Sequence, residues 1–134
     1  MSLGQRIARN VAVLLGCALC GLGVLHDVVS IRWLLRAAGR GQVAEGLVPQ
    51  LVANIALAGV AIALPGVILL LVSPELARGK RLAARLALGC GVFFAVGGLA
   101  GYAWQPIPSV LIFALLGALI CLPLLVWRHE FRAE

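Results

Sequence analysis

Two pairs of residues near the amino terminus carry the side chains best suited to chemistry. His26 and Asp27 are neighbours in an otherwise apolar stretch, where an imidazole can relay protons near neutral pH and a carboxylate can bind a cation. Cys17 and Cys20 have the CxxC spacing of thiol oxidoreductases and of many metal sites. These pairs suggest proton or cation transfer in one case and thiol or metal handling in the other.

The cysteines also have a simpler interpretation. Counted at about 1.5 Å per residue along their helices, all four lie at a similar depth: Cys17, Cys20, Cys90 and Cys121. A free cysteine behaves as a small hydrophobic residue in a helix interface, and a thiolate is costly in hydrocarbon. We therefore expect the cysteines to serve helix packing, with thiol-redox or metal handling through Cys17 and Cys20 as the alternative.

The distribution of charge along the chain indicates which helices position these residues. The chain has 134 residues, 63% of them hydrophobic, with a mean hydropathy of +1.09 and with 11 basic and 5 acidic residues. Residues 10–31 contain only one charged residue, Asp27, whereas residues 46–74 and 86–127 contain none. A water-soluble domain needs a charged face on most of its elements, so this composition excludes one and predicts an integral membrane protein.

The uncharged stretches predict the number of membrane spans. A bilayer core about 30 Å thick is crossed by roughly 20 apolar residues of helix. Pro106 and Pro108 break the longest stretch, which therefore forms two helices. We expect an all-α membrane protein, a four-transmembrane-helix bundle that forms a single domain over residues 1–134, with spans at about 11–29, 51–72, 82–101 and 107–127.

The first span could instead be a cleaved signal, because Arg6 and Arg9 precede a short apolar run that ends at Cys17. The run Val11–Gly16 is shorter than the apolar core of a signal peptide, which needs roughly 7 to 15 residues. The apolar residues also continue beyond Cys17. We therefore expect the first span to be retained.

Basic residues predict the topology, because basic loops resist translocation. With the amino terminus in the cytoplasm, the inner side holds Arg6, Arg9, Arg78, Lys80, Arg81, Arg85, Arg128 and Arg132, and the outer side holds Arg32, Arg36 and Arg40. We expect both termini in the cytoplasm and a bacterial-type inner membrane. The loop residues Arg78, Lys80, Arg81 and Arg85 are expected to anchor to anionic lipid headgroups. Because no aromatic residues interleave with them, nucleic acid is not an expected partner.

The first outer loop admits two structures. Arg32, Arg36 and Arg40 are spaced by four residues, which places them on one helical face opposite apolar residues. This pattern fits a short amphipathic helix on the outer membrane surface. It fits equally well an extension of the first span that breaks at residues 39–41.

Polar residues gather at the predicted outer ends of the spans. The candidate pocket contains His26, Asp27, Ser30, Asn54, Tyr102, Trp104 and Gln105. An ionisable residue inside a span suggests function, although Asp27 could simply meet water or pair with Arg32. His26 and Asp27 supply too few ligands for a metal ion, because His129 is expected on the opposite side. We therefore expect no metal, no cofactor and no catalytic set.

Small residues mark the surfaces where helices approach closely in lipid. The third and fourth predicted spans carry Gly91, Gly97, Gly98, Gly101, Ala114, Gly117 and Ala118. These faces predict a non-enzymatic accessory subunit of a larger membrane complex, or a small homo-oligomer. The alternatives are a small transporter or proton-coupled carrier that uses His26, Asp27 and Asn54, and a thiol-redox or metal-handling protein.

Overall fold

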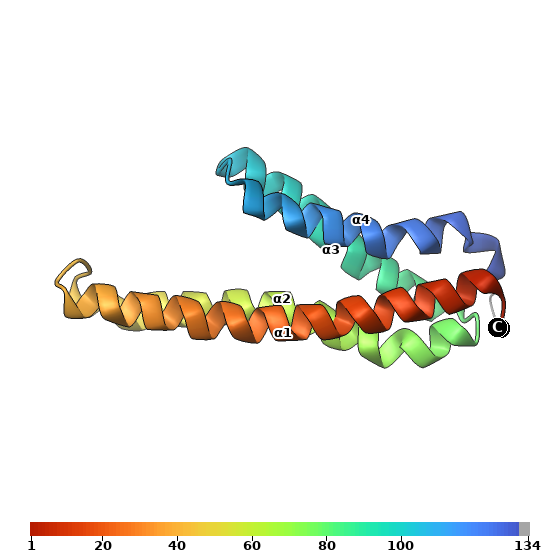
Figure 1. Cartoon of the computed structure of the whole chain (residues 1–134), viewed down its shortest axis with the longest axis horizontal. Coiled ribbons are helices and arrows are strands. Elements are labelled where there is room, and N and C mark those ends of the chain that lie inside the picture. The colour runs from red at the N-terminus through yellow and green to blue at the C-terminus, as the bar shows by residue number, and fades with distance from the viewer. Residues whose placement is uncertain (132–134) are drawn as a thin grey trace. The chain divides into compact units, whose positions relative to one another are not determined.

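The computed structural model describes residues 1–131, and these residues form an all-helical fold with no β-strand (Figure 1). The α-helices are α1 (Leu3–Gly39), α2 (Val48–Ala77), α3 (Arg81–Trp104) and α4 (Leu111–Val126), and short 3-10 helices occupy Glu45–Leu47, Pro108–Val110 and Arg128–Glu130. The all-α prediction and the division of the longest uncharged stretch into two helices are confirmed. Arg132, one of the basic residues counted above, lies outside the described residues.

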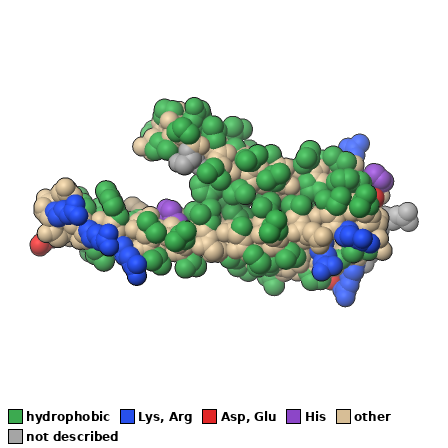
Figure 2. Space-filling model, viewed as in Figure 1, with side chains coloured by type: hydrophobic (Ala, Val, Ile, Leu, Met, Phe, Trp, Pro, Cys, Tyr) green, Lys and Arg blue, Asp and Glu red, His purple; other side chains and the backbone are tan. Residues whose placement is uncertain are grey.

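Three of the helices are long and apolar enough to cross a membrane. They are α1, α2 together with its preceding 3-10 helix, and α3, whereas α4 is shorter, at 16 residues. Only 22% of the most apolar stretch of α1 and of α2, and 33% of that of α3, is buried. In Figure 2, hydrophobic side chains cover the helices between their ends, and Lys and Arg side chains gather near the helix ends. Exposed apolar surface of this extent is typical of helices that lie in lipid.

The helices extend beyond the apolar runs that predict them. α1 has 37 residues, which is about 55 Å of helix, because arginine, leucine and alanine flank its apolar core and all favour helix. Residues 31–38 belong to α1, so the extension is the alternative that the structure adopts, and no separate surface helix forms among the described residues. The helix ends at Gly39, and Gly41 has a φ of 70° in the turn that follows.

The chain divides into two compact units, and α1 and α2 contribute to both. Residues 17–66 form one unit, which contains the second half of α1 and the first part of α2. Residues 1–16 and 67–131 belong to the other unit, which contains the remainder of those helices together with α3 and α4.

In the unit that contains α3 and α4, glycines let these two helices approach closely. A Cβ atom at Gly117 would collide with backbone atoms of Ala95 and Gly91, and one at Gly98 would collide with the backbone of Ala114. The rings of Phe94 and Phe113 stack between the helices with centroids 5.9 Å apart. Close backbone approach through small residues is the usual means by which helices associate in lipid.

A capping box begins α1 in the same unit. The backbone N–H of Gln5 donates to Ser2 Oγ at 3.3 Å, and the backbone N–H of Ser2 donates to Gln5 Oε1 at 2.9 Å. Ser2 Oγ also donates to Glu130 Oε2 at 2.5 Å, and Gln5 Nε2 donates to the Glu130 carbonyl at 3.2 Å. The start of α1 is thereby joined to the last 3-10 helix of the described chain.

Candidate functional site

Asp27 occupies the space beside a glycine in the unit formed by residues 17–66. A Cβ atom at Gly59 of α2 would meet the Asp27 carboxylate of α1, and one at Gly23 would lie 2.6 Å from the Gly59 carbonyl oxygen and 2.8 Å from Ala63 Cβ. Glycines on both helices therefore bring α1 and α2 together. The carboxylate fills the gap that the missing side chain of Gly59 leaves.

His26 is the polar partner of Asp27. A hydrogen bond joins His26 Nδ1 to Asp27 Oδ1 at 3.2 Å, and the two side chains are 35% and 27% exposed. Among the described residues, Asp27 has no ion pair with Arg32, which was the alternative partner suggested by the sequence. The local geometry therefore gives a histidine–aspartate pair that is only partly shielded by its own chain.

The contact with Gly59 gives a second measure of where Asp27 lies along the helices. Counted on α1, Asp27 is five residues from Arg32, or about 7.5 Å, which suggests a position near the end of a span. Counted along α2 and the 3-10 helix before it, its neighbour Gly59 is 14 residues from Glu45 and 16 from Glu75, or roughly 20 Å from either charge. Asp27 therefore lies against the middle of the uncharged stretch of α2.

The remaining residues of the predicted polar pocket are distributed between the two units. In the unit with Asp27, the side chain of Asn54 is exposed and forms no hydrogen bond to a described residue, whereas Ser30 lines an apolar groove of about 450 Å³ with Trp33 and Leu51. Tyr102, Trp104 and Gln105 belong to the other unit, at the end of α3, and all three are exposed. The geometry brings together His26 and Asp27 of this set.

The four cysteines are free thiols, and those of the CxxC motif have different surroundings. Cys17 is exposed, whereas the thiol of Cys20 donates to the Ala63 carbonyl of α2 at 3.7 Å. In the other unit Cys90 is buried, and the Cys121 thiol donates to the Leu88 carbonyl of α3 at 3.9 Å. Among the described residues, no three histidine, cysteine or acidic side chains are grouped as they would be to hold a metal ion.

The predicted packing residues of α3 and α4 fall on two faces. Gly91, Gly98, Ala114 and Gly117 lie where the two helices meet, and a Cβ atom at Gly101 would lie 3.0 Å from the Val110 side chain in the hairpin. Gly97 would accept a Cβ atom with no neighbour within 4 Å, and Ala118 is also exposed. The Gly97-x-x-x-Gly101 pattern therefore does not form the contact between α3 and α4.

The predicted lipid anchors also divide into two sets. Arg78 Nη1 lies 2.6 Å from Glu75 Oε1 and Lys80 Nζ lies 3.0 Å from Glu75 Oε2, so these two cations share one carboxylate. Glu75 lies beyond the expected span 51–72, and the hydrogen bond from Lys80, helped by the charges of Arg78 and Lys80, holds its pKa below the ordinary value. Arg81 and Arg85 instead line a groove between α3 and α4.

Sequence reasoning missed several residues that shape these sites. Gly59 meets Asp27 across two helices, so nothing in the local sequence marks it. Ser2 and Gln5 do carry a signal, because S-x-x-Q is a capping-box pattern. Glu75 could have been recognised as the only acidic residue within five positions of Arg78 and Lys80.

Comparison with known proteins finds no match to this chain. No protein-family model matches the chain, and neither the curated proteins nor the solved structures contain a significant match to it.

Proposed function

We propose that this chain is a small multi-pass membrane protein without enzymatic activity, which works by assembling with other transmembrane helices. The assembly is a small homo-oligomer or a larger complex in which the chain is an accessory subunit. Its four helices are the four spans, and α4, with its preceding 3-10 turn at Pro108–Val110, is the shortest of them.

The observation that carries this proposal is a polar side chain on the outward face of α2. Asn54 is exposed and has no side-chain partner among the described residues, and exposed Ala58 and Ala61 follow it at helical spacing. An amide in hydrocarbon is costly unless it is hydrogen-bonded, and small residues beside it let a second helix approach. A helix from another molecule would satisfy both requirements.

Open glycines on α3 support the same proposal. Gly89 and Gly97 are exposed, and a Cβ atom at either position would have no neighbour within 4 Å. Glycine in a helix interior costs up to about 1 kcal/mol relative to alanine, so two glycines without a role inside the chain are better explained by a partner outside it.

The test compares two outward positions on α2 after reconstitution into lipid bilayers. Ala58→Leu blocks the proposed face, whereas the control Val60→Leu enlarges a side chain that is 58% exposed and lies about 200° around the helix. We expect Ala58→Leu and Asn54→Leu to weaken association about tenfold or more in cross-linking or subunit-exchange assays, and Val60→Leu to leave it unchanged. Equal association of all four proteins would contradict the proposal. Copurification from the native membrane then separates a stoichiometric partner from a self-oligomer.

The proposal includes a topology with both termini in the cytoplasm. The contacts of Ser2 and Gln5 with Glu130 support placing both termini on one side of the membrane. The excess of basic residues near those ends supports the cytoplasmic side of an inner membrane. Labelling of single cysteines placed at Ser2 and Gln42 with an impermeant reagent, in a variant that lacks the native cysteines, tests this topology.

A second candidate function is proton or cation transport through His26 and Asp27. The observation that favours it is the Asp27 carboxylate held between α1 and α2 against Gly59 and hydrogen-bonded to His26, because an ionisable residue within a span is retained at a cost. Asn54, which was grouped with this pair on sequence grounds, is better assigned to the association face.

The second candidate is tested in proteoliposomes that contain a pH-sensitive dye. Asp27→Asn, which keeps the shape of the side chain, should abolish proton flux if this function is correct. Asn54→Leu serves as the matched control and should leave the flux through each molecule intact. Flux that is unchanged in Asp27→Asn would exclude the candidate.

The thiol alternative remains a weaker proposal. Cys20 is directed toward the Ala63 carbonyl and Cys17 is exposed, so the two thiols do not share one surrounding. Changing both to alanine should leave the function and metal content of the cell intact, and loss of either would revive the alternative.

A further inference from the structure

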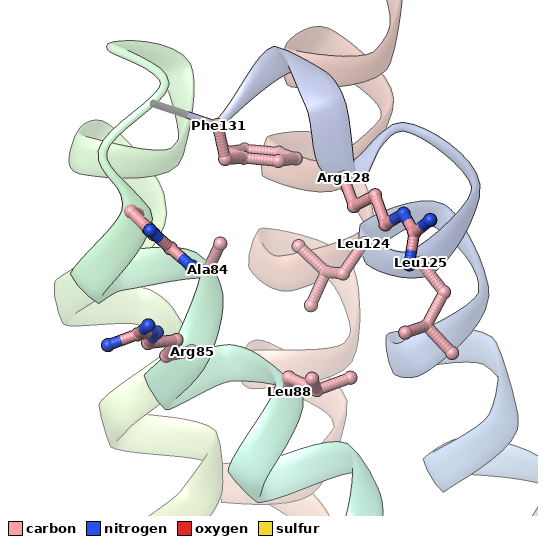
Figure 3. Close-up of a pocket in the computed structure, with 8 residues that line it drawn as sticks. Ala84, Arg85, Leu88, Leu124, Leu125, Arg128 and Phe131 are labelled. Atoms are coloured by element: carbon pink, nitrogen blue, oxygen red, sulfur yellow. The ribbon is translucent and has the colours of Figure 1, made fainter. Parts of the chain in front are cut away.

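A groove between α3 and the end of α4 combines basic rims with an apolar floor. Its volume is about 410 Å³, and its basic lining residues are Arg81, Arg85 and Arg128. Figure 3 shows Arg85 of α3 and Arg128 on opposite sides, with Leu88, Leu124 and Phe131 between them. The groove lies entirely within the unit that contains α3 and α4.

The order of side chains along each helix follows the order of groups in a phospholipid. On α3, Arg81 and Arg85 are one turn apart, and Leu88 follows toward the middle of the helix. On the other side, Leu124 lies in the last turn of α4 and Arg128 lies four residues later, in the 3-10 helix Arg128–Glu130. On both sides, cationic groups near the helix end give way to apolar groups toward the bilayer core.

The three arginines have no acidic partner among the described residues. Each ion pair that joins basic and acidic side chains at this end involves Glu75, which pairs with Arg78 and Lys80. Guanidinium groups bind phosphate oxygens through paired hydrogen bonds, and basic pockets between transmembrane helices bind anionic lipid headgroups. A free phosphate would use the arginines alone, whereas a lipid would also cover the leucines.

We infer that this groove is a binding site for one anionic phospholipid of the surrounding bilayer. The arginines on the two sides of the groove attract the anionic headgroup, and an acyl chain lies against Leu88 and Leu124. This site differs from general attraction of the basic loop to a charged membrane surface, because it is formed by both helices and excludes Arg78 and Lys80.

The test measures lipid bound to the full chain in mild detergent by native mass spectrometry. After lipid removal, the protein is titrated with phosphatidylglycerol, with phosphatidylcholine and with inorganic phosphate. The groove variant is Arg85→Gln with Arg128→Gln, and the matched control is Arg6→Gln with Arg9→Gln, which removes the same charge from exposed positions outside the groove. Circular dichroism checks that both variants keep their helices.

We expect one phosphatidylglycerol on the wild type and on the control, bound more tightly than phosphatidylcholine. The groove variant should lose about 25-fold in affinity for phosphatidylglycerol, since each of its two arginines near an anionic headgroup contributes about fivefold. Equal losses in the two variants would show only general charge attraction and would overturn the site. Tight binding of phosphatidylcholine, or displacement of the lipid by millimolar phosphate, would also overturn it.

Discussion

Two helix interfaces use glycines for close approach but are filled differently. One lies between α3 and α4, and the other lies between α1 and α2 within residues 17–66. Between α3 and α4, Gly98 and Gly117 face backbone atoms, and aromatic rings complete the contact. Between α1 and α2, Gly59 faces the carboxylate of Asp27. The first interface is filled by backbone, aromatic rings and the Cys121 thiol, whereas the second holds a carboxylate.

This difference suggests that Gly98 and Gly117 serve helix packing, whereas Gly59 makes room for a group that can take part in chemistry. A backbone–backbone contact leaves no room for an added side-chain atom and so constrains how the two helices pack. A glycine that accommodates a carboxylate keeps a costly group where it can exchange protons or bind a cation. The comparison predicts that substitutions in the two interfaces differ in size and in whether a second substitution can rescue them.

The largest effect is expected in the interface between α3 and α4. In Gly117→Ala, the new methyl group meets backbone atoms of Ala95 and Gly91, which cannot rotate away. We expect a loss of about 3 kcal/mol in the free energy of unfolding, measured by reversible unfolding in mixed micelles. Gly97→Ala is the control, because its methyl group has no neighbour within 4 Å. A Gly117→Ala protein as stable as this control would refute the close contact.

A smaller and reversible effect is expected in the interface that holds Asp27. Gly59→Ala forces the carboxylate to turn away, which should cost about 2 kcal/mol, because a side chain can move where a backbone cannot. Adding Asp27→Ala should recover most of this loss, as a double-mutant cycle would measure. Gly21→Ala, on a face with no neighbour within 4 Å, is the control. Strict additivity of the two substitutions would mean that they do not touch.

The capping box at the start of α1 should contribute less. Ser2→Ala removes the side-chain acceptor of the Gln5 N–H and the donor to Glu130, and should cost about 1 kcal/mol. Hydrogen exchange at the Gln5 amide is expected to rise, and Ser2→Asn should restore its protection. Unchanged exchange in Ser2→Ala would argue against the cap.

The smallest effect concerns the ion pairs of Glu75. Because Lys80 and Arg78 lower the folded-state pKa of Glu75, its contribution is present above the ordinary glutamate value and is lost as the pH falls through the folded-state value. Wild type should therefore lose slightly more stability than Glu75→Gln in acid titrations followed by circular dichroism. Glu45→Gln is the control and should follow the wild-type curve. Coincident curves for all three proteins would show that the ion pairs of Glu75 do not contribute to stability.

The helices themselves could be predicted from the sequence, but their ends could not. Three stretches with one charge or none, together with the break at Pro106, give four helices. The ends differ because hydropathy marks where lipid begins, whereas helix propensity decides where the helix stops. Arg32 and Arg36 lie outside the apolar run and still favour helix, so α1 continues to Gly39.

The contacts of the candidate site could not be predicted from the sequence, for a related reason. Helices that are apolar on all sides give no sign of which face meets a neighbour. Gly97 and Gly98 are adjacent and equally small, yet only Gly98 meets α4. The partnership of Asp27 with Gly59, 32 residues away, likewise depends on how α1 is rotated against α2.

Solid-state NMR of the protein in lipid bilayers tests the position of Asp27 most directly. Asp27 is the only aspartate in the sequence, so its labelled carboxyl carbon gives an unambiguous signal. We predict a cross-peak between that carbon and Cα of Gly59, assigned through the sequential amide of Val60. A spectrum in which Gly23 and Ala63 are in contact but the Asp27 carboxyl carbon shows no contact with Gly59 would contradict the account.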